Sequence, residues 1–188
     1  MIDIAPPLIL TLKLDAESFA AFDDLRREHF PPERNFLRAH VTLFHALPGE
    51  HESSIRETLY RVCVQTEAMK TAFPKLRFMG RGVAVELDCP PLIKLKNNLT
   101  KHWHAWLSAQ DRQGFRPHVT IQNKVAPEEA RSLYNHLAGN WQPLEGRGEG
   151  LMLWYYMGRN WKHAADFAFE HKHELSSTLS ILAAPKSR

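Results

Sequence analysis

The tripeptide His-Val-Thr occurs twice in this chain, at His40–Thr42 and at His118–Thr120. A random sequence of the same length and composition is expected to contain it about 0.02 times, so chance does not explain the pair. Side chains alternate between the two faces of a β-strand, so His40 and Thr42 share one face while the apolar residues beside them point to the other. Each copy therefore predicts a strand that packs against a core on one side and presents an imidazole and a hydroxyl on the other.

The elements around the two motifs follow the same order, which indicates an internal duplication. Corresponding strands and helices are expected to begin at Leu8 and Val83, at Asp15 and Pro90, and near Ser53 and Pro127. The offset between partners is nearly constant, as in a duplicated unit. We therefore expect one bilobal α+β domain over residues 1–170, with pseudo-repeats at about 8–80 and 83–157. The polar tail, residues 171–188, is expected to be partly flexible.

Hydrophobic periodicity and turn-forming residues predict the individual elements. The predicted strands are 8–14, 38–47, 75–80, 83–89, 117–122, 150–157 and 161–170. The predicted helices are 16–29, from Ser53 or Ser54 to about 69, 91–109 and 127–139.

Composition limits the classes of protein to which the chain can belong. The hydrophobic share of 44% supports one sizeable core or two small lobes that share a cleft. A net charge of +3 suits anionic substrates but does not indicate a protein that coats nucleic acid. Cys63 and Cys89 lie in apolar runs and are expected to be buried thiols. The chain has no secretory signal pattern and no apolar run of the roughly 18 residues that a membrane span requires, so we expect a cytoplasmic protein.

The two motifs also suggest a chemistry. If a local two-fold relates the repeats, the two histidines face each other across a cleft, where one imidazole can act as general base and the other as general acid. The threonine hydroxyls can donate hydrogen bonds to phosphate oxygens as negative charge develops. Such a site requires neither a metal nor another cofactor. The other closely spaced histidines in the sequence do not have the spacing of metal ligands, so no metal site is predicted.

The sequences HVTLF and PHVTIQ, within a duplicated α+β chain of this length, resemble the 2H (two-histidine) phosphoesterase superfamily, and in particular its 2′-5′ RNA ligase and cyclic phosphodiesterase branch. The resemblance extends over roughly residues 8–170. It implies a bilobal fold in which two antiparallel-rich sheets flank a central cleft, with helices outside and the motifs on central strands. It also implies that His40 and His118 form the acid–base pair, and that Thr42 and Thr120 hold the phosphate.

The reaction implied by this resemblance is metal-independent hydrolysis of a 2′,3′-cyclic phosphate, on an RNA end or a nucleotide, to a 2′-phosphate. With an RNA 5′-hydroxyl in place of water, the same chemistry is 2′-5′ ligation. Two alternatives stay open, namely a hydrolase of small nucleotides, such as ADP-ribose cyclic phosphate or 2′-5′-linked oligonucleotides, and a non-catalytic module that binds RNA ends. The protein is expected to be a monomer. The dipeptide Phe44-His45 departs from the apolar stretch expected after the first motif and leaves the substrate preference open.

Four further residues are candidates for substrate binding. Arg116 lies two residues before His118, so in an extended strand it shares the face of that histidine, where it attracts phosphate or is an ordinary surface charge. Phe44 shares the predicted face of the first motif and either stacks on a base or packs in the core. Trp154 and Tyr156 share one face of a late strand, where they either line the groove and stack on nucleobases or pack in the protein.

Overall fold

The computed structural model describes residues 5–170, and the tail predicted at 171–188 lies outside the described residues. The strands are β1 (Leu8–Leu14), β2 (Val41–Leu47), β3 (Met69–Phe73), β4 (Leu76–Phe78), β5 (Gly82–Glu86), β6 (His118–Asn123), β7 (Leu144–Tyr156) and β8 (Trp161–Ala168). The helices are α1 (Ala16–His29), α2 (Glu52–Cys63), α3 (Pro90–His102), α4 (Ala109–Arg112) and α5 (Pro127–Ala138), with short 3-10 turns at Pro32–Arg34 and Gly49–His51. None of these helices is long and apolar enough to cross a membrane.

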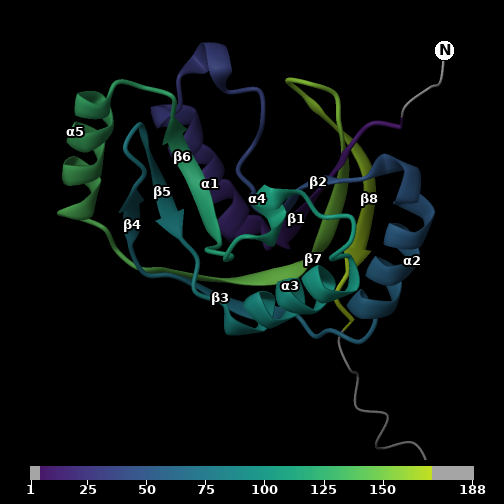
Figure 1. The fold of residues 1–188 in the computed structure, drawn as a ribbon. Helices are drawn as coiled ribbons and strands as arrows, with labels where there is room; N and C mark the ends of the chain where they lie inside the picture. The colour runs from purple at the N-terminus through teal and green to yellow at the C-terminus, as the bar shows by residue number, and fades with distance from the viewer. Residues whose placement is uncertain (1–4, 171–188) are drawn as a thin grey trace, which may run out of the picture.

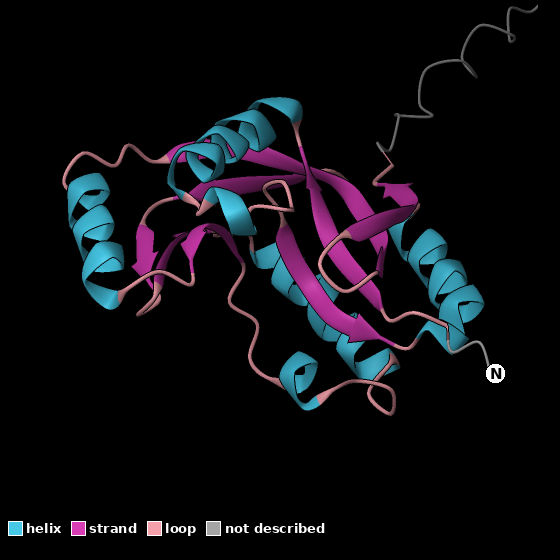
Figure 2. Ribbon diagram, turned by 90° about the horizontal axis from the view of Figure 1, so that it is seen from above, coloured by secondary structure: helices cyan, strands magenta, loops and turns pink. Residues whose placement is uncertain are grey.

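The strands form two antiparallel sheets. The larger has the order β2-β1-β7-β3, and β8 also pairs with β7; the smaller has the order β4-β5-β6. The long strand β7 curves along most of the larger sheet and pairs first with β3 and then with β1 and β8 (Figure 1). Helices α2 and α5 lie at opposite ends of the molecule, and the short helix α4 lies near its centre, beside β2 (Figure 1 and Figure 2). The predicted α+β fold with two antiparallel sheets is confirmed.

Helix α1 begins where the sequence predicts, because Asp15 caps it. The Asp15 carboxylate accepts hydrogen bonds from the backbone N–H of Ser18 at 2.9 Å and from that of Arg147 at 2.6 Å. A capping carboxylate satisfies backbone donors that the first turn leaves free. The second of these bonds joins the start of α1 to β7. At the same contact, a Cβ on Gly146 would lie 1.9 Å from the Ser18 hydroxyl, so this position of β7 requires glycine.

Three predicted boundaries differ from the structure by six residues or more. The helix predicted to reach about residue 69 ends at Cys63, and the next apolar residues instead alternate along β3, where Met69, Thr71 and Phe73 are buried. The helix predicted to reach residue 109 ends at His102, because the chain turns there before the separate short helix α4. Strand β7 begins at 144 rather than 150. Its residues 144–148 pair with β3, and the glycines at 146 and 148 permit close packing there.

A buried arginine ties the first half of the chain to the second. Arg26 of α1 is 4% exposed and donates hydrogen bonds to the carbonyls of Leu37 and Thr120, each at 2.8 Å. Burial lowers its pKa to about 10, so the guanidinium stays charged at neutral pH. Helix α1 therefore holds both the segment before the first motif and the strand of the second. The thiols of Cys63 and Cys89 are free and buried, as predicted.

Candidate functional site

The two motifs lie on strands that contact each other across the gap between the sheets. Strands β2 and β6 are each the last strand of their sheet, and they approach one another closely. The expectation of central strands is therefore wrong, since both motif strands lie at sheet edges. An edge strand has only one neighbour in its own sheet, which leaves its other side free to face the second motif.

The two histidines make the same local hydrogen bond. The Nδ1 atom of His40 lies 2.7 Å from the carbonyl oxygen of Arg38, and that of His118 lies 2.8 Å from the carbonyl oxygen of Arg116. A carbonyl oxygen can only accept, so Nδ1 carries the proton in each ring. In the neutral imidazoles, Nε2 is then the atom with a free lone pair, available to take up a proton.

Each motif strand also contains a β-bulge immediately after its threonine. In β2, Thr42 pairs with Thr11 and Phe44 with the adjacent Leu10, so Leu43 is an extra residue. In β6, Thr120 and Gln122 pair with adjacent residues of β5 in the same way. A bulge interrupts the alternation of side chains between the two faces of a strand. The repeated tripeptide thus lies in a repeated backbone irregularity.

This bulge overturns one predicted site residue. Strict alternation placed Phe44 on the same face as His40 and made it a candidate for stacking on a base. Because of the extra residue, Phe44 turns into the core, where its side chain is fully buried and its ring centroid lies 5.3 Å from that of Trp103. The prediction that Phe44 stacks on a substrate is wrong, and the core alternative is correct.

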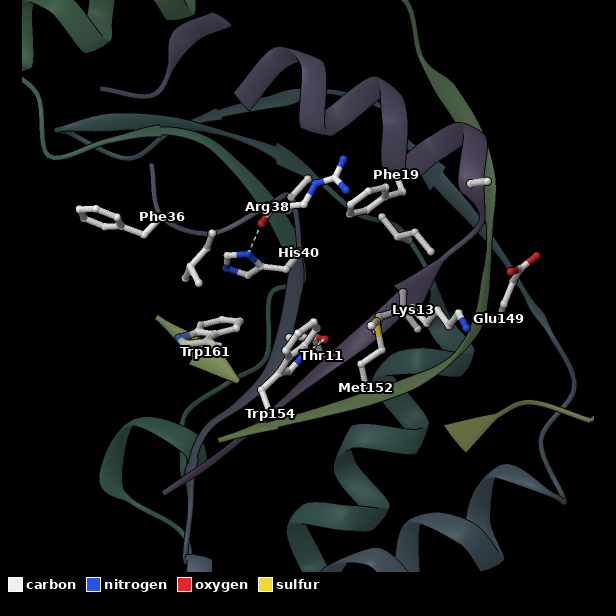
Figure 3. A pocket seen from close by; sticks show the side chains of 15 residues that line it. Thr11, Lys13, Phe19, Phe36, Arg38, His40, Glu149, Met152, Trp154 and Trp161 are labelled. Atoms are coloured by element: carbon white, nitrogen blue, oxygen red, sulfur yellow. Dashed lines mark hydrogen bonds between the residues drawn. The ribbon is translucent and has the colours of Figure 1, made fainter. Parts of the chain in front are cut away.

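His40 borders the larger of two pockets, which we call the aromatic pocket. It has a volume of about 540 Å³ and is lined mainly by apolar side chains, among them Phe19, Phe36, Met152, Trp154 and Trp161. The Trp161 ring lies 4.7 Å from the His40 imidazole, and Figure 3 shows both side chains bordering the same space. The two cations at its edge are paired, Arg38 with Asp23 and Lys13 with Asp166, and Glu149 is an acidic residue of the same lining. This pocket therefore suits a flat, uncharged group.

The structure separates the two aromatic candidates of β7. Trp154 lines the aromatic pocket, and its indole N–H donates to the Thr11 hydroxyl at 2.9 Å. Tyr156 is 44% exposed and lines neither pocket. Trp161 was not among the residues predicted for the site, although its place after a tight turn of the hairpin was a signal for it. The tight turn of the β7–β8 hairpin pairs Trp161 with Tyr156, which puts it on the face that Trp154 occupies.

His118 borders the smaller pocket, which we call the polar pocket. It has a volume of about 210 Å³. Its polar lining residues come from both motif strands, β4, α3, α4 and the segment before β6: Thr42, His45, Arg77, Lys96, Gln110, Asp111, Gln113, Arg116 and His118. The first motif's threonine and the second motif's histidine thus line one space. Arg116 lies beside His118 there, where sequence analysis expected it. Thr120 is partly exposed on β6 but lines neither pocket.

The surroundings of both histidines favour the neutral imidazole. Burial lowers the pKa of His40 to about 4, assisted by the charge of Arg26 and by its proximity to His118. Burial also lowers the pKa of His118, with a further contribution from Arg77, whereas the carboxylate of Glu86 acts in the opposite direction. Glu86 is the direct cross-strand partner of His118. Both pKa values are therefore lowered, and His118 has an acidic neighbour in register.

Within residues 5–170, no group of three or more His, Cys, Asp or Glu side chains is arranged to hold a metal ion. The groups that the site presents are imidazoles, hydroxyls and basic side chains. Together they can transfer protons and bind an anion.

The fold is that of a curled two-sheet α+β protein with a paired histidine motif. Residues 14–160 match the family model of the 2′-5′ RNA ligase superfamily. The chain therefore belongs to that superfamily, as the resemblance of its motifs predicted. A comparison with curated protein sequences found no match.

Solved structures share the fold at low sequence identity. A Thermus thermophilus protein, TT0787, is 16% identical, with a TM-score of 0.64, over 89% of this chain and 100% of that one. E. coli LigT complexed with 3′-AMP is 19% identical, with a TM-score of 0.61, over 89% and 99% of the two chains. E. coli LigT complexed with phosphate is 19% identical, with a TM-score of 0.59, over 90% and 100%. At these identities the likeness concerns the fold.

Proposed function

We propose that the chain is a phosphoesterase that hydrolyses 2′,3′-cyclic phosphates, on RNA ends or nucleotides, to 2′-phosphates by acid–base catalysis with His40 and His118. The observation that carries the proposal is the matched pair of histidines, His40 directly before β2 and His118 at the start of β6. These two edge strands contact each other, and each histidine has Nδ1 held by a carbonyl and Nε2 left to exchange a proton. Family membership supports it, as do the E. coli LigT complexes with 3′-AMP and with phosphate. The cytoplasmic location and the monomeric state remain predictions.

The two histidines take different roles in this proposal. Nε2 of His40, whose pKa is about 4, is the general base that removes a proton from water as its oxygen attacks phosphorus. His118, with Glu86 opposite it, is the general acid whose Nε2–H protonates the ribose O3′ as the P–O3′ bond breaks. Thr42 and Thr120 donate to the phosphate oxygens. The proton balance closes within this pair, and an RNA 5′-hydroxyl in place of water forms a 2′-5′ linkage.

The test is hydrolysis of adenosine 2′,3′-cyclic phosphate by the His40→Ala and His118→Ala variants. Loss of a general acid or base costs about 10²–10⁴-fold in kcat. His136→Ala, an exposed histidine of α5, is the matched control and is expected to keep wild-type activity. Both catalytic variants should still bind adenosine 2′-phosphate, measured by calorimetry, because the pockets remain.

Two results would contradict this proposal. Retained hydrolysis in the double variant would remove the assignment of the histidines. A wild-type protein that binds RNA ends but turns over no cyclic phosphate would favour the non-catalytic binding module instead.

A further inference from the structure

The polar pocket contains a buried lysine that the proposed reaction does not use. Lys96 of α3 is 3% exposed, and its ammonium group donates to the backbone carbonyl of Asp111 at 2.6 Å. The same nitrogen lies 4.6 Å from the ring centroid of Phe44 and 5.8 Å from that of Phe115. Removing an ammonium group from water costs several kcal/mol unless other groups compensate. The carbonyl, the two ring faces and the charge of the nearby Asp111 carboxylate compensate in part, and an anion in the pocket would stabilise this ammonium further.

The carboxylate of Asp111, near Lys96, forms its hydrogen bonds with other groups. Asp111 is 3% exposed, and its carboxylate oxygens accept hydrogen bonds from the backbone N–H groups of His45 at 2.8 Å and Ala46 at 3.0 Å. One of these oxygens also contacts Nδ1 of His45 at 3.1 Å. A carboxylate can only accept, so His45 donates from Nδ1, and its ring is held at the wall of the polar pocket. Asp111 thus positions His45 and forms no ion pair with Lys96.

Two arginines add positive charge to the same pocket. Arg77 of β4 and Arg116 both line it. Among residues 5–170, no hydrogen bond or ion pair engages either guanidinium. The pocket therefore combines three cationic side chains with a single carboxylate, whereas the cations at the edge of the aromatic pocket are already paired. The polar pocket would therefore attract an anionic group, whereas the aromatic pocket would not.

We propose that the polar pocket binds a second phosphate of the substrate, the 5′-phosphate of the nucleotide whose 2′,3′-cyclic phosphate reacts. This inference rests on the proposed function, in which the reacting phosphate lies between the two histidines. Lys96, Asp111 and Arg77 come from α3, α4 and β4, so the pocket extends beyond the motif strands. The preferred substrates are then RNA 3′ ends and 5′-phosphorylated nucleotides, and a nucleoside cyclic phosphate without a 5′-phosphate is a poorer substrate.

The test compares two ligands that differ only in the 5′-phosphate, adenosine 2′-phosphate and adenosine 2′,5′-bisphosphate, by calorimetry with the wild-type protein. Charge-assisted hydrogen bonds to the added phosphate should lower the Kd by about tenfold or more. In Arg77→Gln and in His45→Gln, the ratio of the two Kd values should fall toward one. Arg131→Gln, an exposed arginine of α5, is the matched control in which the ratio is unchanged.

Equal binding of the two ligands by the wild-type protein would overturn the inference, as would a ratio that Arg77→Gln and His45→Gln leave intact. Binding does not depend on turnover, so these outcomes are separate from those of the hydrolysis assay. Active hydrolysis without a 5′-phosphate preference leaves the proposed function standing and removes only the second phosphate site.

Discussion

The two copies of His-Val-Thr have the same backbone environment but different chemical surroundings. Both histidines donate Nδ1–H to the carbonyl two residues before, and both strands bulge after the threonine. His40 of the first copy borders an apolar space with two tryptophans, whereas His118 of the second borders a pocket with three cationic side chains. A repeated tripeptide can thus repeat its local geometry while the unrepeated neighbours give each copy its own role.

The sharpest test of these different roles uses the leaving group. A p-nitrophenyl ester of a nucleotide releases a phenolate that needs no proton, so it does not require a general acid. On this substrate the loss caused by His118→Ala should be about 100-fold smaller than on the cyclic phosphate. His40→Ala should lose as much on both substrates, because attack by water still needs a base. Steady-state kcat values for the two variants and the wild type measure this. Equal losses for the two variants on the ester would break the proposed assignment of base and acid.

A second test addresses the aromatic side of the comparison. Trp161→Ala should raise the KM for adenosine 2′,3′-cyclic phosphate about tenfold, because stacking of a base on an aromatic ring contributes about 1–3 kcal/mol. Tyr156→Ala is the matched control from the paired position of the same hairpin, and its KM should not change. A larger effect of Tyr156 than of Trp161 would instead favour the binding surface predicted from the sequence.

The smallest expected effect concerns pH. The base must be neutral and the acid protonated, so kcat/KM should be highest between the pKa of His40, about 4, and that of His118, which burial lowers from 6.5. Activity therefore falls as the pH rises above the pKa of His118. Glu86→Gln removes the carboxylate that opposes this lowering, so the alkaline limb should move to lower pH and activity at pH 7 should drop about threefold. Glu128→Gln, on α5, is the control. An alkaline limb that moves to higher pH in Glu86→Gln would contradict the assignment of His118 as the general acid.

Much of the fold could be predicted from local signals. Asp15 begins a helix because its carboxylate satisfies free backbone donors, and the apolar residues of each motif strand pack into a core as their alternation indicates. The predictions of secondary structure failed where the local sequence signal was weak or where the structure depends on distant contacts. The strand predicted to start at Gly150 begins at Leu144, because residues 144–148 pair with the distant strand β3.

The residues of the candidate site also divide into those with a local signal in the sequence and those that depend on distant contacts. Phe44 was placed on the wrong face, because a bulge depends on pairing with the neighbouring strand and leaves no mark in the local pattern. Lys96 and Asp111 gave no signal, since each lies in an ordinary helical segment and becomes notable only when α3 and α4 meet the motif strands.

Local sequence was enough to predict two equivalent extended segments, each with a histidine and a threonine beside an apolar pair, because a strand's period of two and the repeated tripeptide are local properties. The neighbours of each histidine, in contrast, follow only from the packing of the folded chain. The two pockets bring together residues from β1, β2, β4, β6, β7, β8, α1, α3 and α4. Such contacts arise when sheets and helices pack against one another, and that packing depends on the whole chain at once.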